Sequence, residues 1–571
     1  MADSSNETPK KTGKGEMSME TRLLIAFLLM GVVLFVTPYV YKQPPQPKAA
    51  PAKAPAPAAK AVEKAAAAPP PAVEAKPLPG QVAAAKEETH VVETDVFRVV
   101  FSNRGAAVRS WILKKYTDRA GKPLDLVNQP GAAKTGFPFS LVFPKQKPAA
   151  DLSGALYAAR LDPDGAGISF QYSNGSVFSE KSFRFARGTY LVKVASEVRQ
   201  AGAGPVPHFL AWRGGFGDPS VEAAYKALHT LYWDTSENKL VVNEAKVAAD
   251  GPVTRGANYA FAGIEDAYFA AVFLGNGSSS FEIQTYSDGV KPPAADKEEP
   301  HAGFAAGGSG ENRFSVFVGP KNLDILRKVD PKLEQVVDFG WFSILARPLF
   351  LALNWVNDKL VRNYGWSIVV VTVIINFLLL PLKISSLRSA KKMQVLQPQI
   401  AAINEKYKHL SLRDPRKAEQ NQELMDLYKR NGVNPLGGCV PVVLQIPFFF
   451  AFYKVLSVAI EMRGAHWLWV TDLSRPETIP IRILPVAMIV TQFILQKMTP
   501  NPSADPSQQR IMMLMPLMFG FMFYGVQSGL VLYWLTGNVV GIAQQWFFNR
   551  TAHISVREPK PAVPKKKSSR K

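Results

Sequence analysis

Eight side chains capable of hydrogen bonding lie in or beside stretches of the sequence that are otherwise apolar. They are one hydroxyl and seven amides: Thr372, Asn376, Gln445, Gln492, Gln496, Asn538, Gln544 and Gln545. Such side chains can form hydrogen bonds with a polar group of another segment inside an apolar region. An unpaired polar group in such a region raises the free energy. The alternative is hydrogen bonding between neighbouring helices, which is worth about 0.6–2 kcal/mol per bond and is common in helical bundles.

The sequence carries no pattern typical of a covalent catalyst. His90, His208, His229 and His301 are scattered, and there is no HExxH, GxSxG or glycine-rich phosphate loop. The single cysteine, Cys439, excludes an intramolecular disulfide and a CxxC site, and its apolar surroundings favour a small buried hydrophobe. We therefore expect no enzyme activity, no metal site, no cofactor and no small-molecule substrate.

Five apolar stretches in the second half predict membrane-spanning helices, because ~20 apolar residues cross a bilayer and backbone groups in lipid must be paired internally. They are residues 365–382, 438–458, 483–497, 511–526 and 529–548. Residues 23–41 form another apolar stretch, which could be a cleaved signal sequence or an uncleaved anchor. Its length, with Tyr39 and Tyr41 at its far end, favours the uncleaved anchor.

The region between the first and second spans predicts a tether followed by a β-sandwich. Residues 42–90 are rich in Ala, Pro and Lys and hold too few large apolar side chains to fold. Residues 91–330 contain short alternating segments separated by turn residues, which is the pattern of a sandwich. The alternating segments are residues 97–102, 139–143, 169–173, 190–198 and 313–319. The adjacent carboxylates Glu265 and Asp266 are expected to lie in a solvated turn.

The distribution of charge predicts the orientation in the membrane. The net charge of +21 would suggest nucleic acid if it covered a folded surface, but many cations flank the apolar stretches instead. Residues 383–434 carry eleven Lys or Arg, whereas residues 459–482 carry three, balanced by acids. Periodic apolar positions from Met393 to Tyr407 and from Leu424 to Tyr428 predict that the first of these segments is a hairpin of two amphipathic helices. The positive-inside bias places the hairpin, residues 1–22 and the basic tail (549–571) in the cytoplasm. The β-domain and the 459–482 loop then lie outside.

Five runs of sequence resemble, in the same order, segments of the YidC family of membrane protein insertases. The runs are FGWFSILARPLF (339–350), NPLGGCVPVVLQIPFFFAFY (434–453), WVTDLS (469–474), DPSQQRIMMLMPLMF (505–519) and SGLVLYWLTGNVVGIAQQW (528–546). One run alone would be weak, but their order across residues 339–548 makes the resemblance specific.

The resemblance implies a fold, a location and partners. The fold would be a helical bundle of six spans, an amphipathic interfacial helix at 339–364 and a periplasmic β-supersandwich, as in Gram-negative members of the family. The protein would insert and help fold nascent membrane proteins in the bacterial inner membrane, alone or with the Sec translocon. Besides nascent clients and lipids, its partners would include the ribosome, through the basic tail and the hairpin.

The resemblance also implies a polar groove that is open to the cytoplasm and to lipid. The residues expected to line it are Thr372, Asn376, Gln445, Gln492, Gln496, Asn538 and Gln544. The residues expected to contact the client helix are Ile446, Phe449, Tyr533 and Trp534, with ordinary bundle packing as the alternative. The family usually has an arginine where this chain has Asn376, so we expect a neutral polar groove.

Two other classes of function compete with this interpretation. A solute transporter or channel would usually place ionisable residues within its spans and often has an inverted repeat, and neither feature is visible here. A membrane-anchored carbohydrate-processing enzyme would leave five further spans unexplained.

Overall fold

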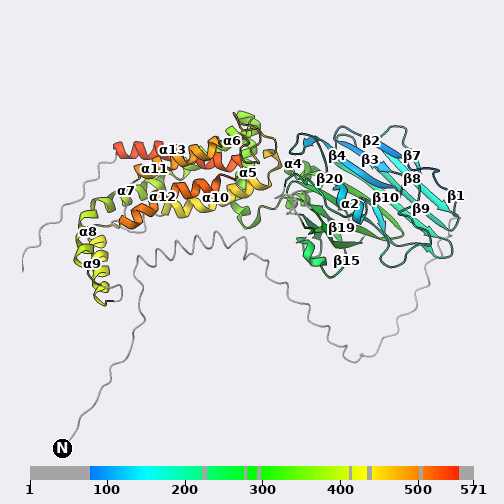
Figure 1. Ribbon diagram of the computed structural model, residues 1–571, viewed down its shortest axis with the longest axis horizontal. Coiled ribbons are helices and arrows are strands. Elements are labelled where there is room, and N and C mark those ends of the chain that lie inside the picture. The colour runs from blue at the N-terminus through cyan, green and yellow to red at the C-terminus, as the bar shows by residue number, and fades with distance from the viewer. Residues whose placement is uncertain are drawn as a thin grey trace, which may run out of the picture.

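The computed structural model describes residues 78–221, 228–275, 280–291, 297–410, 414–433, 440–499 and 506–551. A β-rich part and a helical part lie end to end (Figure 1). The predicted first span (23–41), most of the predicted linker and nearly all of the basic tail lie outside the described residues.

The β-rich part contains three antiparallel sheets. The eleven-stranded sheet follows the order β1-β8-β9-β10-β20-β17-β16-β13-β14, with β11 beside β10 and β7 beside β8; the others are β15-β18-β19-β12-β6 and β2-β3-β4-β5. The strands are β1 (Gln81–Val82), β2 (Thr89–Glu93), β3 (Phe97–Ser102), β4 (Ala107–Thr117), β5 (Pro123–Asp125), β6 (Ser140–Val142), β7 (Ala158–Leu161), β8 (Gly167–Asn174), β9 (Val177–Phe185), β10 (Leu191–Gln200), β11 (Gly204–Pro205), β12 (His208–Trp212), β13 (His229–Asp234), β14 (Lys239–Asn243), β15 (Val253–Ala257), β16 (Tyr259–Glu265), β17 (Phe269–Leu274), β18 (Phe281–Val290), β19 (Glu299–Ser309) and β20 (Glu311–Pro320). The five alternating segments correspond to β3, β6, β8, β10 and β20, so those predictions are confirmed.

An aromatic core joins the three sheets. The ring of Phe139 contacts Trp111 from β4, Phe183 from β9 and Trp212 from β12, with ring centroids 5.9, 5.4 and 5.9 Å away. Each of these four side chains is almost fully buried. Since the partners come from three different sheets, this cluster fixes how the sheets pack.

A buried ammonium group stabilises the backbone around this core. Lys181 is fully buried and donates to the carbonyls of Gly105, Ala106 and Phe139 at 2.7, 3.0 and 2.8 Å. Ala106 and Phe139 have positive φ angles of 47° and 62°, which are unfavourable for residues with a side chain. The three hydrogen bonds help to hold these two residues in that conformation.

The carboxylates of Glu265 and Asp266 are buried, so the expectation of a solvated turn is wrong. Glu265 forms an ion pair of 2.8 Å with the buried Lys321. Asp266 accepts three backbone N–H groups, from Asp218, Tyr268 and Phe269. Burial raises the pKa of Asp266 to about 6 even though these hydrogen bonds favour its ionised form. The sequence alone did not reveal these partners, because Lys321 and Asp218 are distant in the chain.

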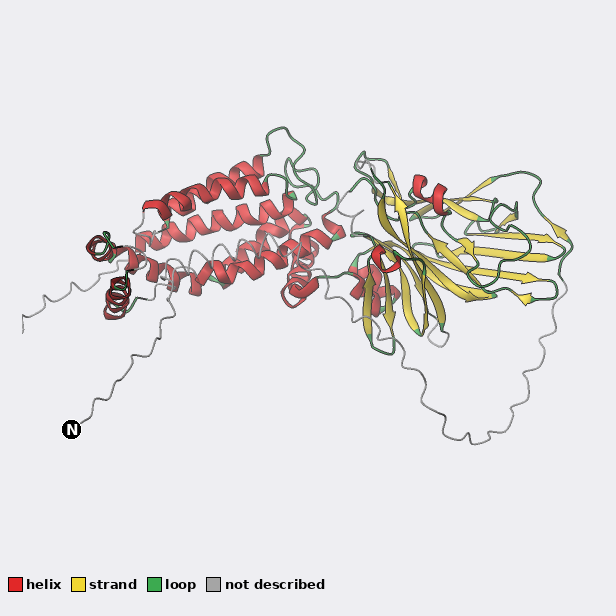
Figure 2. Ribbon diagram, turned by 60° about the horizontal axis from the view of Figure 1, so that its bottom comes forward, coloured by secondary structure: helices red, strands yellow, loops and turns green. Residues whose placement is uncertain are grey.

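The helical part is a bundle in which the long helices run side by side (Figure 2). Its elements are α4 (Leu323–Val329), η2 (Pro331–Val336), η3 (Gly340–Phe342), α5 (Ser343–Val356), the π-helical turn η4 (Asn357–Val361), α6 (Tyr364–Leu378), α7 (Leu380–Val395), α8 (Gln397–Lys406), α9 (Arg416–Arg430), α10 (Val440–Val458), η6 (Ile460–Met462), α11 (Ile483–Met498), α12 (Pro506–Phe523) and α13 (Ser528–Thr551). A short helix, α2 (Gln129–Thr135), and the turn η1 (Ala245–Ala248) belong to the β-rich part.

Within the described ranges, no individual helix combines the length and the apolar composition needed to cross a bilayer. One bent pair passes that test together: Ser343–Val361 and Tyr364–Leu378, which meet at 115°. Shorter apolar helices are Gln445–Val458, Ile483–Met498 and Met513–Phe523.

The charged hairpin lies at the end of the bundle opposite the β-rich part (Figure 1). Its predicted first helix is divided into α7 and α8, which separate at Leu396, and Pro398 lies in the first turn of α8. Met393, Leu396, Ile400 and Val433 form a small buried cluster here. The periodic apolar residues of the hairpin therefore pack against one another in a separate small core.

The two parts of the chain meet where α4 begins. The Asn322 amide caps α4 by accepting the N–H of Ile325 at 3.0 Å, and it donates to Glu461 of η6 at 2.7 Å. The second carboxyl oxygen of Glu461 is buried with no hydrogen-bond partner among the described residues. Burial, reinforced by Asp324 and Asp358, raises the pKa of Glu461 to about 7.

Replacing Lys181 with Met should destabilise the β-rich part by at least about 3 kcal/mol, because three buried carbonyls lose their donor. The measurement is hydrogen exchange of the β9 peptide (177–185) in the purified chain under increasing urea. Lys193→Met is the matched control, since Lys193 is exposed on the neighbouring β10. Equal exchange in the two variants would show that the ammonium group is dispensable.

The contact made by Glu461 should weaken as the pH rises. Because its folded pKa lies above the ordinary value of 4.5, the stabilisation is complete below pH 4.5 and is lost as the pH rises through about 7. Glu461→Gln imitates the protonated form, so it should match the wild type at pH 4.5 and unfold about 5 °C higher at pH 8.5. The measurement is the thermal unfolding temperature of both proteins across this pH range. A constant difference between the two proteins at every pH would contradict the raised pKa of Glu461.

Candidate functional site

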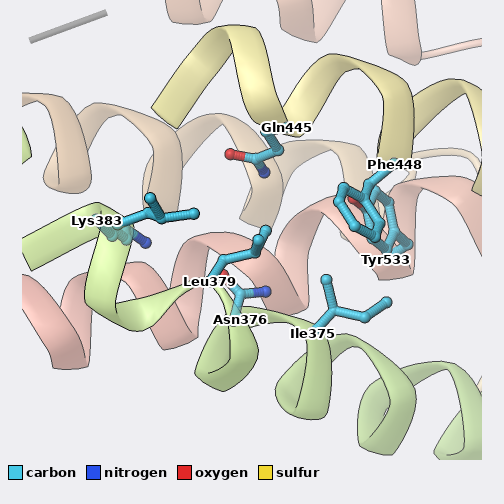
Figure 3. Close-up of a pocket in the computed structure, with 8 residues that line it drawn as sticks. Ile375, Asn376, Leu379, Lys383, Gln445, Phe448 and Tyr533 are labelled. Carbon is cyan, nitrogen blue, oxygen red and sulfur yellow. The ribbon is translucent and has the colours of Figure 1, made fainter. Parts of the chain in front are cut away.

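A pocket in the helical bundle brings together residues from α6, α7, α10 and α13. Its lining residues are Ile375, Asn376, Leu379, Leu382, Lys383, Gln445, Phe448 and Tyr533. Figure 3 shows Asn376, Lys383 and Gln445 around a space that is otherwise bordered by apolar and aromatic side chains. Two amides and one ammonium group thus face a mostly apolar cavity.

Asn376 lines the pocket from the last turn of α6. Its amide nitrogen donates to the carbonyl of Thr372 at 2.9 Å, and its amide oxygen accepts no hydrogen bond from the described residues. Thr372 itself is fully buried, and its hydroxyl donates to the carbonyl of Ile368 at 2.6 Å. The structure therefore places Asn376, but not Thr372, at the pocket.

Lys383 also lines the pocket, and the expectation of a neutral groove did not include it. It is half-buried, and no carboxylate of the described residues forms an ion pair with it. Gly541 of α13 lies beside it: a Cβ atom added there would lie 3.1 Å from a methyl group of Leu495 and 3.4 Å from the Lys383 ammonium nitrogen. Lys383 was missed because the apolar stretch was ended at residue 382. Lys383 follows Asn376 by two helical turns, and this spacing could have placed both residues on the same face of a helix.

Most of the other predicted groove amides connect helices. Asn538 of α13 is buried and donates to the carbonyl of Met488 and the hydroxyl of Thr491 on α11. Gln492 accepts the indole N–H of Trp534 at 3.2 Å. These contacts fit the alternative of hydrogen bonding within the bundle.

The amides near the hairpin end of the bundle are also outside the pocket lining. Gln544 donates to the backbone carbonyl of Asn376 at 3.3 Å, and Gln545 donates to Asn549 at 2.9 Å. Gln496 belongs to the last turns of α11. Only Asn376 and Gln445 of the predicted groove residues line the pocket in the described structure.

The aromatic residues expected to contact a client separate into two groups. Tyr533 lines the pocket and stacks on Phe452 of α10, with ring centroids 4.4 Å apart. Phe449 and Trp534 contact each other at 5.1 Å and both contact Phe523 of α12. These two residues therefore join α10, α12 and α13, whereas Tyr533 faces the cavity. Ile446 is half-buried and lies outside the lining.

The arrangement offers hydrogen bonds and one positive charge, without a nucleophile–base pair at the pocket. Over the described ranges, no group of three or more His, Cys, Asp or Glu side chains is placed to hold a metal ion. The pocket can therefore hold polar or acidic groups inside an apolar bundle.

Comparisons with known proteins cover nearly all of the described chain. The model of the family "60Kd inner membrane protein" matches residues 355–555, and the model "YidC periplasmic domain" matches residues 89–352. The Membrane protein insertase YidC of Cupriavidus necator is 36% identical over 88% of this chain and 91% of the relative. The protein of the same name from Syntrophus aciditrophicus is 34% identical over 94% of this chain and 100% of the relative.

A solved structure, the active YidC insertase with its first transmembrane domain resolved, has a TM-score of 0.36 and 18% identity, covering 93% of this chain and 100% of its own. The matches to the family models and to the two relatives, over most of their lengths, identify the family. This chain belongs to the YidC family of membrane protein insertases.

Proposed function

We propose that this chain inserts nascent membrane proteins into the inner membrane by receiving a polar client segment in the pocket around Asn376, Lys383 and Gln445. The observation that carries this proposal is an ammonium group beside two amides in an otherwise apolar helical cavity. Membership of an insertase family favours this function over a transporter or channel.

The energetic problem that such a site solves is the transfer of polar groups through hydrocarbon. Each unsatisfied backbone group costs several kcal/mol across the ~30 Å slab. Asn376 and Gln445 supply donors and acceptors to the client backbone, and Lys383 supplies a charge for an acidic side chain. The sequence holds no nucleotide-binding signature, so burial of the client's apolar surface, at about 25 cal/mol per Å², drives release into lipid.

The proposal includes a topology of six spans with both termini in the cytoplasm. The periplasmic family model covers the β-rich part, and the hairpin α8–α9 lies at the opposite end of the bundle (Figure 1). That separation supports a cytoplasmic hairpin. We place the first span at 23–41 and the others at 365–382, 438–458, 483–497, 511–526 and 529–548, with residues 339–364 at the interface.

The partners follow from this topology. Nascent membrane proteins are the clients, and lipid surrounds the bundle. The cytoplasmic hairpin and the basic tail (549–571) provide cations for a ribosome, and the Sec translocon delivers larger clients. In this proposal Ile446, Phe449, Tyr533 and Trp534 contact the apolar client helix, which needs an apolar surface along which to move.

Lys383→Met should reduce insertion of a client whose translocated segment carries an acidic residue about tenfold, because a charge-assisted hydrogen bond is worth about 1.5–3 kcal/mol. Lys383→Arg should retain activity. The measurement is client insertion in cells depleted of their own insertase and rescued by each variant. Lys391→Met is the control: this residue is farther along α7, and its ammonium lies 5.9 Å from the Phe548 ring.

The same assay distinguishes the contribution of the Lys383 charge from that of the Asn376 amide. Asn376→Leu should reduce insertion several-fold for acidic and neutral clients alike, and unchanged insertion would show that Asn376 is ordinary packing. If Lys383→Met behaved like Lys391→Met with every client, the proposed role of the charge would be wrong.

A further inference from the structure

The loop between α10 and α11 inserts a cation into the β-rich part. The Nη2 atom of Arg463 pairs with the carboxylate of Asp218 and donates to the carbonyl of Thr117, the latter at 2.6 Å. The side chains of Arg463 and Asp218 are only 5% and 0% exposed. This contact therefore joins two distant parts of the chain through a fully desolvated ion pair.

The β-rich part surrounds the guanidinium with aromatic rings as well as acceptors. The Arg463 Cζ atom lies 5.7 Å from the ring centroid of Tyr268 and 5.5 Å from that of Phe269. Arginine is suited to such a site because its planar group pairs with carboxylates and stacks on rings. Thr117, Asp218, Tyr268 and Phe269 thus form a receptor surface for one side chain of the helical part.

The β-rich part holds the acidic partner in place by its own contacts. The backbone N–H of Asp218 donates to Asp266 at 3.1 Å, and the Oδ1 atom of Asp218 accepts the N–H and hydroxyl of Ser220 at 2.8 and 2.6 Å. Its other carboxyl oxygen faces Arg463. The receptor surface is therefore pre-organised, and the arrival of Arg463 requires little rearrangement of the β-rich part.

We propose that Arg463 is a latch that fixes the β-rich part on the external loop in a single orientation. The inference goes beyond insertion, since it concerns how the periplasmic domain is held relative to the bundle. The neighbouring contact between Asn322 and Glu461 lies on the same short segment, η6 and the residue after it.

Neutralising one partner of a buried ion pair is more destabilising than neutralising both, because the remaining buried charge has neither its partner nor water around it. Asp218→Asn should therefore disturb the loop more than deletion of residues 91–319, which returns Arg463 to water. The paired neutral variant, Asp218→Asn with Arg463→Gln, should disturb it less than the two single changes combined.

The test is hydrogen exchange of the full chain in lipid nanodiscs, followed in peptides that cover residues 460–463 and 217–220. Arg463→Gln should increase exchange in both peptides at least fivefold, although the substitution lies outside the β-rich part. Glu311→Gln is the matched control, because it breaks the exposed Arg313–Glu311 ion pair in the β-rich part. This readout is independent of client insertion, so its outcome is separate from that of the proposed function.

Exchange of residues 177–200 shows whether a variant has simply unfolded the β-rich part. If Asp218→Asn exposes that core, Arg463→Gln remains the deciding variant, because it leaves the β-rich sequence intact. Unchanged exchange at 217–220 in Arg463→Gln, with or without changes at 460–463, would overturn the latch. Equal effects of Arg463→Gln and Glu311→Gln would overturn it as well.

Discussion

A polar group removed from water needs a partner, and this constraint governs both parts of the molecule. In the bundle, the hydroxyl of Thr372 returns to its own helix, and the amide of Asn538 crosses to α11. The groups that line the pocket differ from these, because Lys383 has no carboxylate partner among the described residues and Gln445 is exposed. The groups at the pocket are therefore available to an outside partner, and the proposed function assigns them to a client's polar groups.

The β-rich part satisfies the same constraint by pairing its buried charges, in one case with a residue of the helical part. Lys181 is held by three carbonyls, Glu265 by Lys321, and Asp218 by Arg463 from the helical part. Charges of this kind add little to net stability but become strongly destabilising when one partner is removed. They consequently specify which surfaces meet, and they connect the β-rich part to the loop between α10 and α11.

Much of the fold could be predicted from local sequence, because periodicity reports which face of an element is buried. Alternation located β3 and β10 within one or two residues. The hairpin was less accurate, since the apolar positions from Met393 to Tyr407 suggested one helix, whereas a proline at its start separates α8 from α7. The burial of Glu265 and Asp266 could not be read from the sequence, because their partners are remote in the chain.

The pocket was predicted in part. Asn376 and Gln445 were identified because a lone amide in an apolar stretch is conspicuous, and Tyr533 was identified through the family resemblance. Lys383 was assigned to the cytoplasmic hairpin because it begins a charged segment. A sequence does not show that α7 continues α6 closely enough to keep Lys383 on the pocket side.

The proposed function requires that this bundle alone lower the barrier for a client helix to enter lipid. The most direct measurement uses vesicles that contain only this purified chain and a simple client with one or two membrane-spanning helices, without nucleotide. We expect protease-protected, membrane-integrated client well above the amount found with empty vesicles. Integration no greater than that of empty vesicles would contradict it.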